Sequence, residues 1–185
     1  MLDFISAEQL TLKHLADRVS EAAISYAVAG SMAVELHGAR RLTNAVNVLL
    51  TSPGLDSFRS DLVPRKYEPV PGRSRRFVDR DNGVIVEVFL TGHYPGRTSP
   101  GPFPFPDPVQ ASQEIDNVRV LTLPHLIQCK LAAGQYSDLG EVVSLIQGHN
   151  MDESYMAQLN PAVHHAFIKC LEEKRRDDEF HARED

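Results

Sequence analysis

The chain has 185 residues, 42% of them hydrophobic and 24% charged, and a formal net charge of −6 at pH 7. These values are typical of a globular chain long enough for one compact domain with a sizeable core. No apolar run approaches the roughly 20 residues that cross a bilayer, which excludes a membrane span, and the negative charge argues against attraction of nucleic acid to the whole surface. The first residues lack the basic head, apolar stretch and cleavage site of a secretory signal, so we expect a cytoplasmic protein.

The first half of the chain alternates between helical and strand patterns. Apolar residues recur near the helical period after Ser6, which is a credible N-cap because Glu8 and Gln9 follow it closely. A short buried strand then ends at Gly30, and Gly38 stops the next helix. The expected elements are a helix over 6–23, a strand over 26–29, a helix over 31–37, a strand over 45–50, a turn cluster over 51–54 and a short helix over 55–62.

The second half adds a hairpin, a long loop and three helices. Asn82 and Gly83 both tolerate positive φ and predict a hairpin turn between two strand patterns. The expected elements are strands over 77–79, 84–90 and 118–121 and helices over 124–133, 138–147 and 161–176. We therefore predict a single α/β domain over 1–176, followed by a polar tail over 177–185.

Proline dominates the segment over 92–108, which therefore cannot form a helix or a central strand. Phe103 and Phe105 are expected to anchor this irregular loop, and the loop is a candidate lid over a pocket. A solvated loop is the favoured interpretation of the basic run over 73–76. The two cysteines of the chain lie in apolar helical patterns and are expected to be reduced core residues.

Three consecutive segments carry a family resemblance. They are Ala29-Gly30-Ser31-Met32-Ala33, Gly38-Ala39-Arg40-Arg41-Leu42-Thr43 and Ala45-Val46-Asn47-Val48-Leu49-Leu50. In this order they resemble the opening signature of the nucleotidyltransferase superfamily, which has Gly-Gly or Gly-Ser after the first strand, an Arg-x-Thr, and an Asp-hydrophobic-Asp pair on the second strand. The segments over 84–90, 126–134 and 138–142 are similar to the third carboxylate strand and to the lysine and aspartate motifs of AbiEii-like members. The resemblance implies an α/β fold with a nucleotidyltransferase-like mixed β-sheet flanked by helices and a C-terminal helical segment.

The chain departs from the family pattern where the paired aspartates are expected. Ala45 and Asn47 stand at those positions, which leaves Glu87 as the one remaining carboxylate of the expected three. A two-metal site needs carboxylates that bridge ions about 3.5–4 Å apart, and alanine and asparagine do not supply them. Weak binding of a single Mg²⁺ by Glu87 and substrate phosphates is not forbidden. We nevertheless expect no metal site, no cofactor and no ordinary nucleotidyl transfer.

The resemblance implies that the functional side chains gather in the cleft of the fold. The catalytic candidates are Glu87, Lys130 and Arg41, for acid-base chemistry that needs no metal. The ligand-binding candidates are Gly30, Ser31, Asn47, Thr43 and His37. The free amides at the start of the helix after Gly30 favour an anionic group, although a merely structural strand-to-helix turn fits the residues equally well.

Two further candidates also have structural interpretations. His37 ends a helix, where an interaction with the helix dipole is the favoured explanation. Lys130 lies among apolar residues and either faces the cleft or extends its ammonium group to solvent, and the resemblance favours the cleft. Asp138 is either the partner of Lys130 or a helix N-cap, and the cap is the favoured interpretation.

Three functions follow from these residues. The leading hypothesis is a degenerate nucleotidyltransferase-fold protein whose cleft binds a small molecule, as a cofactor-free enzyme of specialised metabolism that promotes cyclisation, rearrangement or isomerisation. The second is a noncatalytic regulatory pseudoenzyme that contacts a partner protein through the proline-rich loop and the charged tail. The third is a residual nucleotidyltransferase of toxin-antitoxin type that combines Glu87 with Asp79 or Asp81.

Overall fold

The computed structural model of the chain describes residues 6–39 and 43–182. Its strands are β1 (Tyr26–Ala29), β2 (Ala45–Leu50), β3 (Tyr67–Pro69), β4 (Arg76–Asp79), β5 (Ile85–Leu90), β6 (Ser112–Ile115) and β7 (Val118–Leu121). Its α-helices are α1 (Ala7–Glu21), α2 (Gly30–Leu36), α3 (Ser52–Ser57), α4 (Val63–Lys66), α5 (Leu123–Ala133), α6 (Tyr136–Gly148) and α7 (His164–His181). A π-helical segment η1 (Phe58–Leu62) joins α3 to α4, and the 3-10 segments η2 (Glu153–Gln158) and η3 (Pro161–Val163) precede α7.

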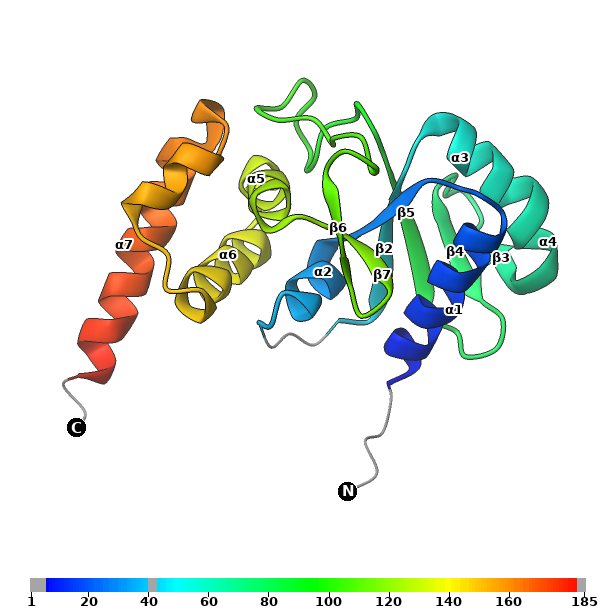
Figure 1. Cartoon of the computed structure of the whole chain (residues 1–185), viewed down its shortest axis with the longest axis horizontal. Coiled ribbons are helices and arrows are strands. Elements are labelled where there is room, and N and C mark those ends of the chain that lie inside the picture. The colour runs from blue at the N-terminus through cyan, green and yellow to red at the C-terminus, as the bar shows by residue number, and fades with distance from the viewer. Residues whose placement is uncertain (1–5, 40–42, 183–185) are drawn as a thin grey trace.

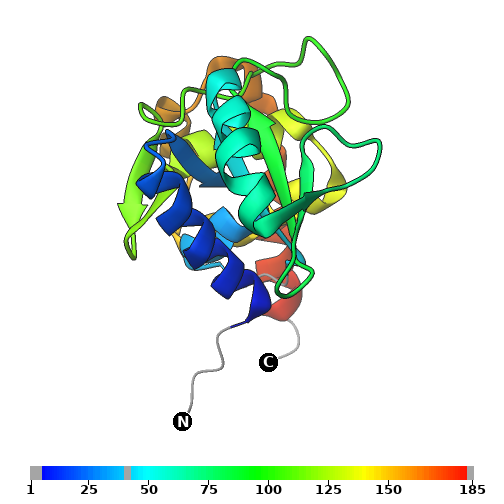
Figure 2. The same cartoon turned by 90° about the vertical axis from the view of Figure 1, so that its right-hand side faces the viewer.

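The seven strands of the described part form one mixed sheet in the order β3-β4-β5-β2-β1-β7-β6. The pairs β2–β5 and β1–β7 are parallel, and the other neighbouring pairs are antiparallel. Figure 1 shows α1, α3 and α4 on one side of the sheet and α2, α5 and α6 on the other, with α7 packed outside α6. In Figure 2, α1 and the helical run from α3 to α4 lie side by side in front of the strands. The predicted class, a mixed β-sheet flanked by helices with a C-terminal helical segment, is confirmed.

Local sequence explains the first helix and the central strands. The Ser6 side chain accepts a hydrogen bond from the Gln9 amide, and the Gln9 side chain accepts one from the Ser6 amide, both at 3.1 Å. This reciprocal capping box confirms the predicted N-cap. All four residues of β1 are buried, as expected for a strand with a neighbour on each edge and helices on both faces. The predicted bounds of β1 and β2 are both confirmed.

An aromatic cluster packs on the α3 side of the sheet near its β3 edge. The ring centroid of Phe58 lies 5.3 Å from that of Tyr67 and 5.1 Å from that of Phe77, and all three side chains are buried. Burying one large apolar side chain contributes about 1.5–3 kcal/mol, so this cluster holds β3 and β4 firmly against the helical run. The register of β4 on β5 then brings Arg76 opposite Glu87.

Three predicted helix starts are wrong. The last helix was predicted to begin at Pro161, but Pro161–Val163 form the 3-10 segment η3 and α7 begins at His164. The residues over 51–54 form the first turn of α3 instead of a turn cluster, because the Thr51 hydroxyl accepts from the Gly54 amide at 3.1 Å and Pro53 occupies a position where no amide donor is needed. Serine, proline and glycine are common in both contexts. Helix α6 begins at Tyr136 after the N-cap Gln135, so Asp138 lies inside the first turn and is not the cap.

The edges of the sheet and the end of the chain also differ from expectation. The strands β3 and β6 were not predicted, because they are short, lie at the two edges and have few buried residues. Helix α7 continues to His181, beyond the predicted end at Arg176 and into the polar tail. The hairpin between β4 and β5 is confirmed, but within its turn positive φ occurs at Gly83 and not at Asn82.

Two composition-based expectations can be compared with the described residues. Cys129 and Cys170 are buried and free, as predicted for reduced core residues. Over the ranges 6–39 and 43–182 there is no helix of sufficient length and apolar character to cross a membrane.

Candidate functional site

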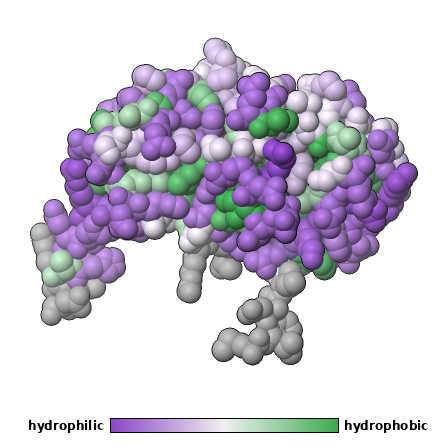
Figure 3. Space-filling view, in the orientation of Figure 1, coloured by the Kyte–Doolittle hydropathy of each residue, from purple (hydrophilic) through white to green (hydrophobic). Residues whose placement is uncertain are grey.

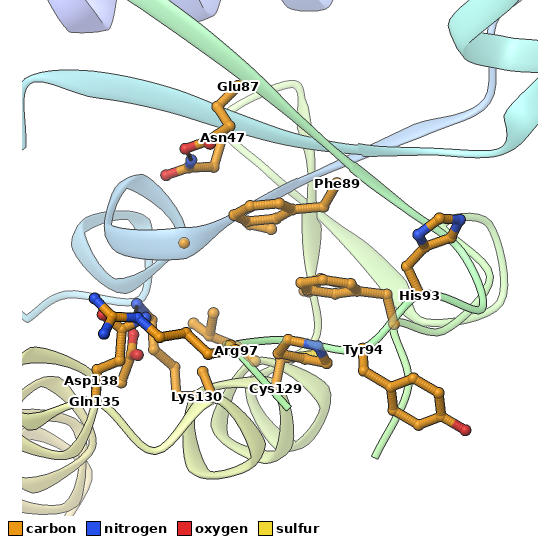
Figure 4. Close-up of a pocket in the computed structure, with 18 of the residues that line it drawn as sticks. Asn47, Glu87, Phe89, His93, Tyr94, Arg97, Cys129, Lys130, Gln135 and Asp138 are labelled. Carbon is orange, nitrogen blue, oxygen red and sulfur yellow. Dashed lines mark hydrogen bonds and ion pairs between the residues drawn. The ribbon is translucent and has the colours of Figure 1, made fainter. Parts of the chain in front are cut away.

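A cavity of about 620 Å³ lies where the carboxyl end of β1 meets β2, β5 and the end of α5. Figure 4 shows the side chains that surround it, with Asn47 and Glu87 at one end and Lys130, Gln135 and Asp138 at the other. The proline-rich loop contributes a further wall. Small-molecule sites occupy roughly 300–1,000 Å³, so the cavity has the size of a ligand site.

Gly30 and Asn47 form the closest approach in the cavity wall. Gly30 has φ +63°, and a Cβ atom at this position would lie 2.3 Å from Asn47 Oδ1. Only glycine combines this backbone conformation with so near a neighbour. The turn between β1 and α2 therefore holds the Asn47 amide group in place at the cavity wall.

Glu87 lies beside Asn47 because β2 and β5 are parallel and in register. Asn47 pairs with Glu87 and Ala45 with Ile85, and residues two apart on a strand share a face, so Ala45, Asn47 and Glu87 lie on the same face of the sheet. Asn47 Nδ2 donates to Glu87 Oε2 at 3.4 Å, a long and weak hydrogen bond.

The carboxylate of Glu87 is only loosely engaged. Arg76 Nη2 lies 3.7 Å from Glu87 Oε2, with the two side chains 42% and 36% exposed. An ion pair at this exposure contributes no more than about 1 kcal/mol. Among the described residues both contacts use Oε2, so Oε1 is the oxygen left to accept a hydrogen bond or a proton from a ligand.

Lys130 belongs to a buried polar network at the other end of the cavity. Its Nζ atom lies 2.9 Å from Asp138 Oδ1 and also contacts Glu141 Oε2. Glu141 Oε1 in turn accepts a hydrogen bond from Ser31 Oγ at 2.6 Å. Buried charges are tolerated only when they are paired, so these contacts must be kept in the folded protein. They link the start of α2 to α5 and α6. Asp138 is thus the partner of Lys130.

The middle of the cavity is aromatic. The rings of Phe89 and Phe105 stack with centroids 4.8 Å apart and planes 12° apart. Backbone hydrogen bonds of 2.8 Å from Gly92 to Phe105 and from Phe105 to His93 hold the two ends of the proline-rich loop together. Phe105 is buried and Phe103 packs against the core, which confirms that these two residues anchor the loop.

The proline-rich loop also contacts helix α5. A Cβ atom at Gly96 would lie 2.8 Å from the Ala133 carbonyl oxygen, and Gly96 has φ +78°. The loop therefore approaches the end of α5 closely, and the residues over 93–99 line the cavity. Figure 4 shows Arg97, from this segment, at the same end of the cavity as Gln135 and Asp138.

The cavity brings together five of the eight predicted site residues, namely Gly30, Ser31, Asn47, Glu87 and Lys130. Three others lie elsewhere or beyond the described residues. His37 is buried, and its Nε2 atom lies 2.8 Å from the Leu121 carbonyl oxygen. Thr43 Oγ1 donates to the Ala45 carbonyl oxygen at 2.9 Å, a local contact that shapes the entry to β2. Arg41 lies outside the described residues.

Burial lowers the pKa of His37 more than its hydrogen bond to the Leu121 carbonyl raises it, and the charge of His149 lowers it further. The imidazole is therefore neutral at pH 7. A favourable interaction with the helix dipole would have raised the pKa, so desolvation is the stronger effect at this helix end.

Several cavity residues were not among the predicted ones. Arg75, His93, Arg97 and Gln135 all line the cavity. Arg75 comes from the basic run that was interpreted as a solvated loop, and His93 and Arg97 come from the candidate lid. The prediction of a lid over a pocket therefore pointed to His93 and Arg97. No feature of the sequence indicated Gln135, which follows the end of a helix.

Two cavity groups bear on the possible chemistry. Burial raises the pKa of the Cys129 thiol to about 12, so it stays protonated and is a poor nucleophile. In the ranges 6–39 and 43–182, no group of three or more His, Cys, Asp and Glu side chains has the arrangement of a metal site. Asn47 and Glu87 offer one neutral amide and one carboxylate, a donor set that fits a polar organic group better than a pair of divalent ions.

Asp79 and Asp81 do not join Glu87. Arg76 is opposite Glu87 and shares its face, whereas Asp79 is three residues further along β4 and points to the other side of the sheet. There Asp79 accepts from Thr11 Oγ1 at 3.0 Å and lies 3.4 Å from Lys66 Nζ. Asp81 lies 2.6 Å from the same Nζ atom. The geometry thus separates these acids from the cavity.

The fold and the site together define an α/β protein with a mixed sheet and a polar cavity beside its central strands. Neither protein-family models nor curated protein sequences match the chain. Similar solved structures include JHP933 from Helicobacter pylori, with 13% identity and a TM-score of 0.47 over 83% of this chain and 73% of that one. They also include an antigenic nucleotidyltransferase-like protein from Paracoccidioides brasiliensis, with 17% identity and a TM-score of 0.48 over 75% of this chain and 74% of that one.

Proposed function

We propose that the chain is a nucleotidyltransferase-fold protein that has lost its metal-binding carboxylate pair and whose cavity binds a small organic molecule. One observation carries this proposal. Asn47 lies beside Glu87 and against Gly30, with Ala45 on the same face of the sheet, and Glu87 is the one carboxylate of these three residues. This supports the proposal, because the resemblance assigns the three family carboxylates to positions 45, 47 and 87. If the missing charges cost even about 4 kcal/mol of transition-state stabilisation, nucleotidyl transfer would be slowed roughly a thousandfold.

The lining indicates the kind of molecule. The aromatic pair Phe89 and Phe105 provides an apolar middle, and charged groups stand at both ends of the cavity. Arg75 and Arg97 would attract an anionic or carbonyl-bearing group, while the Asn47 amide group would orient a second polar group near Glu87. We therefore infer a small ligand with a planar or apolar centre and at least one carboxylate, phosphate or ketone.

Glu87 is the residue that would act on such a ligand. Its carboxylate would remove a proton from a carbon next to a carbonyl group and return it at another position, so that an isomerisation is balanced without a cofactor. We assign Lys130 a positioning role, because its ammonium group is engaged by Asp138 and also contacts Glu141. An enzyme of specialised metabolism is the form of this function that we favour.

The test compares small-molecule binding by matched variants. Wild-type protein, Glu87→Gln and the control Glu114→Gln, whose residue lies on the edge strand β6, would each be dialysed to equilibrium against a metabolite extract and the retained compounds identified by mass spectrometry. We expect compounds with a carbonyl or carboxylate group to be enriched by wild type and by the control, and to be retained more weakly by Glu87→Gln. Equal enrichment by all three proteins, or retention of nucleoside triphosphates only with Mg²⁺, would contradict the proposal.

A second candidate, partner binding without catalysis, has its own observation. Tyr136 is 95% exposed on the first turn of α6, next to the cavity residues Gln135 and Asp138. On the face shown in Figure 3, hydrophobic residues appear in small separate areas among hydrophilic ones. A partner would therefore dock through a few anchors, and Tyr136→Ser should weaken its binding without changing the unfolding free energy by more than about 0.5 kcal/mol.

A further inference from the structure

The proline-rich loop has an anchored neck and an unanchored tip. Backbone hydrogen bonds of 2.8 Å join Gly92 and His93 to Phe105, and Thr91 Oγ1 donates to the carbonyl oxygen of residue 106 at 3.1 Å. Within residues 6–39 and 43–182, the segment over 94–104 makes no hydrogen bond or ion pair. Segments with few hydrogen bonds and an exposed backbone open at a low cost in free energy, so the tip is the part of the cavity wall that moves most readily.

The composition of the tip determines how it can move. It contains four prolines, whose rings fix φ, and two glycines, Gly96 and Gly101. Backbone rotation is therefore concentrated at the two glycines, and the tip moves as a stiff flap. In Figure 1 the loop is the green irregular trace at the top of the view, next to α5.

Gly96 is the residue through which the tip rests on α5. A Cβ atom at this position would lie 2.8 Å from the Ala133 carbonyl oxygen and 3.0 Å from the Ala133 Cα atom. Both are backbone atoms of a hydrogen-bonded helix, which cannot yield as a flexible side chain would. A larger residue at position 96 would therefore displace the tip from the helix.

An apolar recess of the cavity lies on the face of α5 that the tip contacts. Leu126, Cys129 and Ala133 are spaced by three and four residues, so they share one face of the helix. Leu126 and Cys129 line the cavity and yet are buried. Figure 4 shows Cys129 at the cavity wall on α5, beside Lys130. A molecule reaches this recess only when the tip moves away from α5.

We propose that residues 94–104 form a lid that separates from α5 at Gly96 and admits the apolar part of a ligand to the recess at Leu126 and Cys129. The polar groups of the same ligand remain at Asn47 and Glu87. Closure then removes the apolar part from water, which favours molecules with an apolar or planar portion over wholly polar ones. The inference rests on the proposed function, because ligand entry is what the opening serves.

The two cysteines of the chain report the opening without a known ligand. Cys129 lies in the recess, whereas Cys170 is buried on α7 and does not line the cavity. Opening of the lid exposes Cys129 alone, and global unfolding exposes both thiols. Labelling of the full chain with N-ethylmaleimide, followed by mass spectrometry of peptic peptides, gives a rate for each thiol. That rate follows the population of the open state when closing is fast.

Wild type alone tests whether a local opening exists. We expect Cys129 to react faster than Cys170, and low concentrations of urea should change the Cys129 rate little, because a local opening exposes little surface. Equal rates with equal urea dependence at the two thiols would show that only global unfolding exposes them, and the lid would be refuted.

Gly96→Ala and Gly83→Ala test the place of the opening as a matched pair. Gly96 has φ +78° and Gly83 has φ +77°, but a Cβ atom at Gly83 would meet no atom within 4 Å. The two variants thus share the backbone strain, and Gly96→Ala alone pushes the tip from α5. Overpacking of this kind should make Cys129 react roughly 10- to 100-fold faster in Gly96→Ala than in Gly83→Ala, with equal rates at Cys170. Equal Cys129 rates in the two variants would overturn the proposal.

The labelling experiment separates this proposal from the proposed function, because it needs no ligand. Local labelling of Cys129 together with no enriched compound in the dialysis experiment would contradict the proposed function and support the lid. Enriched compounds together with no local labelling of Cys129 would overturn the lid alone.

Discussion

Restoring the two missing carboxylates tests the geometry on which the proposed function depends. The double variant Ala45→Asp with Asn47→Asp changes two residues on one face of β2, and β2 pairs in register with the strand that carries Glu87. Three carboxylates would then converge beside Gly30. Asparagine and aspartate have nearly the same shape, so the tight contact with Gly30 does not oppose the second change.

The expected loss of stability follows from the distance between the groups. Asn47 Nδ2 and Glu87 Oε2 are 3.4 Å apart, and two like charges at that separation repel by about 1 kcal/mol in water and about 5 kcal/mol at an effective dielectric constant of 20. Because the Glu87 side chain is 36% exposed, the lower part of this range applies, about 1–2 kcal/mol. For a chain of this length each kcal/mol lowers the melting temperature by about 2–4 °C.

Metal binding should reverse that loss. A divalent ion present at a hundredfold excess over its dissociation constant stabilises the folded protein by about 2.7 kcal/mol. Differential scanning calorimetry with and without Mg²⁺ or Mn²⁺ measures both effects. Wild type and Ala45→Asn, which adds a neutral amide at the same position, are the controls and should show no metal-dependent rise. If the double variant gains no more from metal than wild type does, positions 45, 47 and 87 do not form a common site and the resemblance on which the site rests is refuted.

Three more predictions concern the same structure. Gly30→Ala should destabilise the protein by roughly 2 kcal/mol more than Gly38→Ala. Both glycines have positive φ, but only Gly30 would place a Cβ atom against Asn47. Chemical unfolding should show a smaller difference between the two variants when Asn47→Ala is also present. Isothermal titration of wild type with Mg²⁺ and ATP should give no saturable heat at millimolar nucleotide, and a micromolar, metal-dependent affinity would contradict the proposed loss of the metal site. Burial lowers the pKa of His37 in the folded protein, so the unfolded state binds more protons and the free energy of unfolding should fall as the pH drops through about 6.5. Urea unfolding at pH 7.5 and 5.5 measures this fall, which should be smaller in His37→Asn than in the exposed control His181→Asn.

Much of the fold could be predicted because local sequence determines it. The apolar run from Ala45 to Leu50 and the capping box at Ser6 specify a buried strand and a helix start without reference to the rest of the chain. The stop at Gly38 depends on its positive φ of +89°, which glycine adopts readily. Periodicity, capping residues and glycine positions act over a few neighbouring residues, and they can therefore be predicted from the sequence alone.

The two edge strands, β3 and β6, could not be predicted from local sequence. Tyr67–Pro69 and Ser112–Ile115 become strands only because β4 and β7 offer them hydrogen-bonding edges. Asp138 in the first turn of α6 shows the same limit of local sequence. Aspartate suits both a helix N-cap and an ion pair with lysine, and the choice depends on the distance to Lys130, eight positions earlier on another helix. Propensity cannot decide between two such roles.

For the candidate site, the sequence by itself determined which residue types stand at the positions that resemble the family motifs, and the proposed loss of a carboxylate pair depends on Ala45 and Asn47 at two of them. Only the tertiary structure decided which residues from distant segments join them. Arg75 and Arg97 reach the cavity because the β4–β5 register and the stacking of Phe89 on Phe105 bring their loops to its walls. These contacts depend on packing between segments far apart in the chain. That packing contributes its free energy only when the segments are folded together, so no local stretch of sequence reveals it.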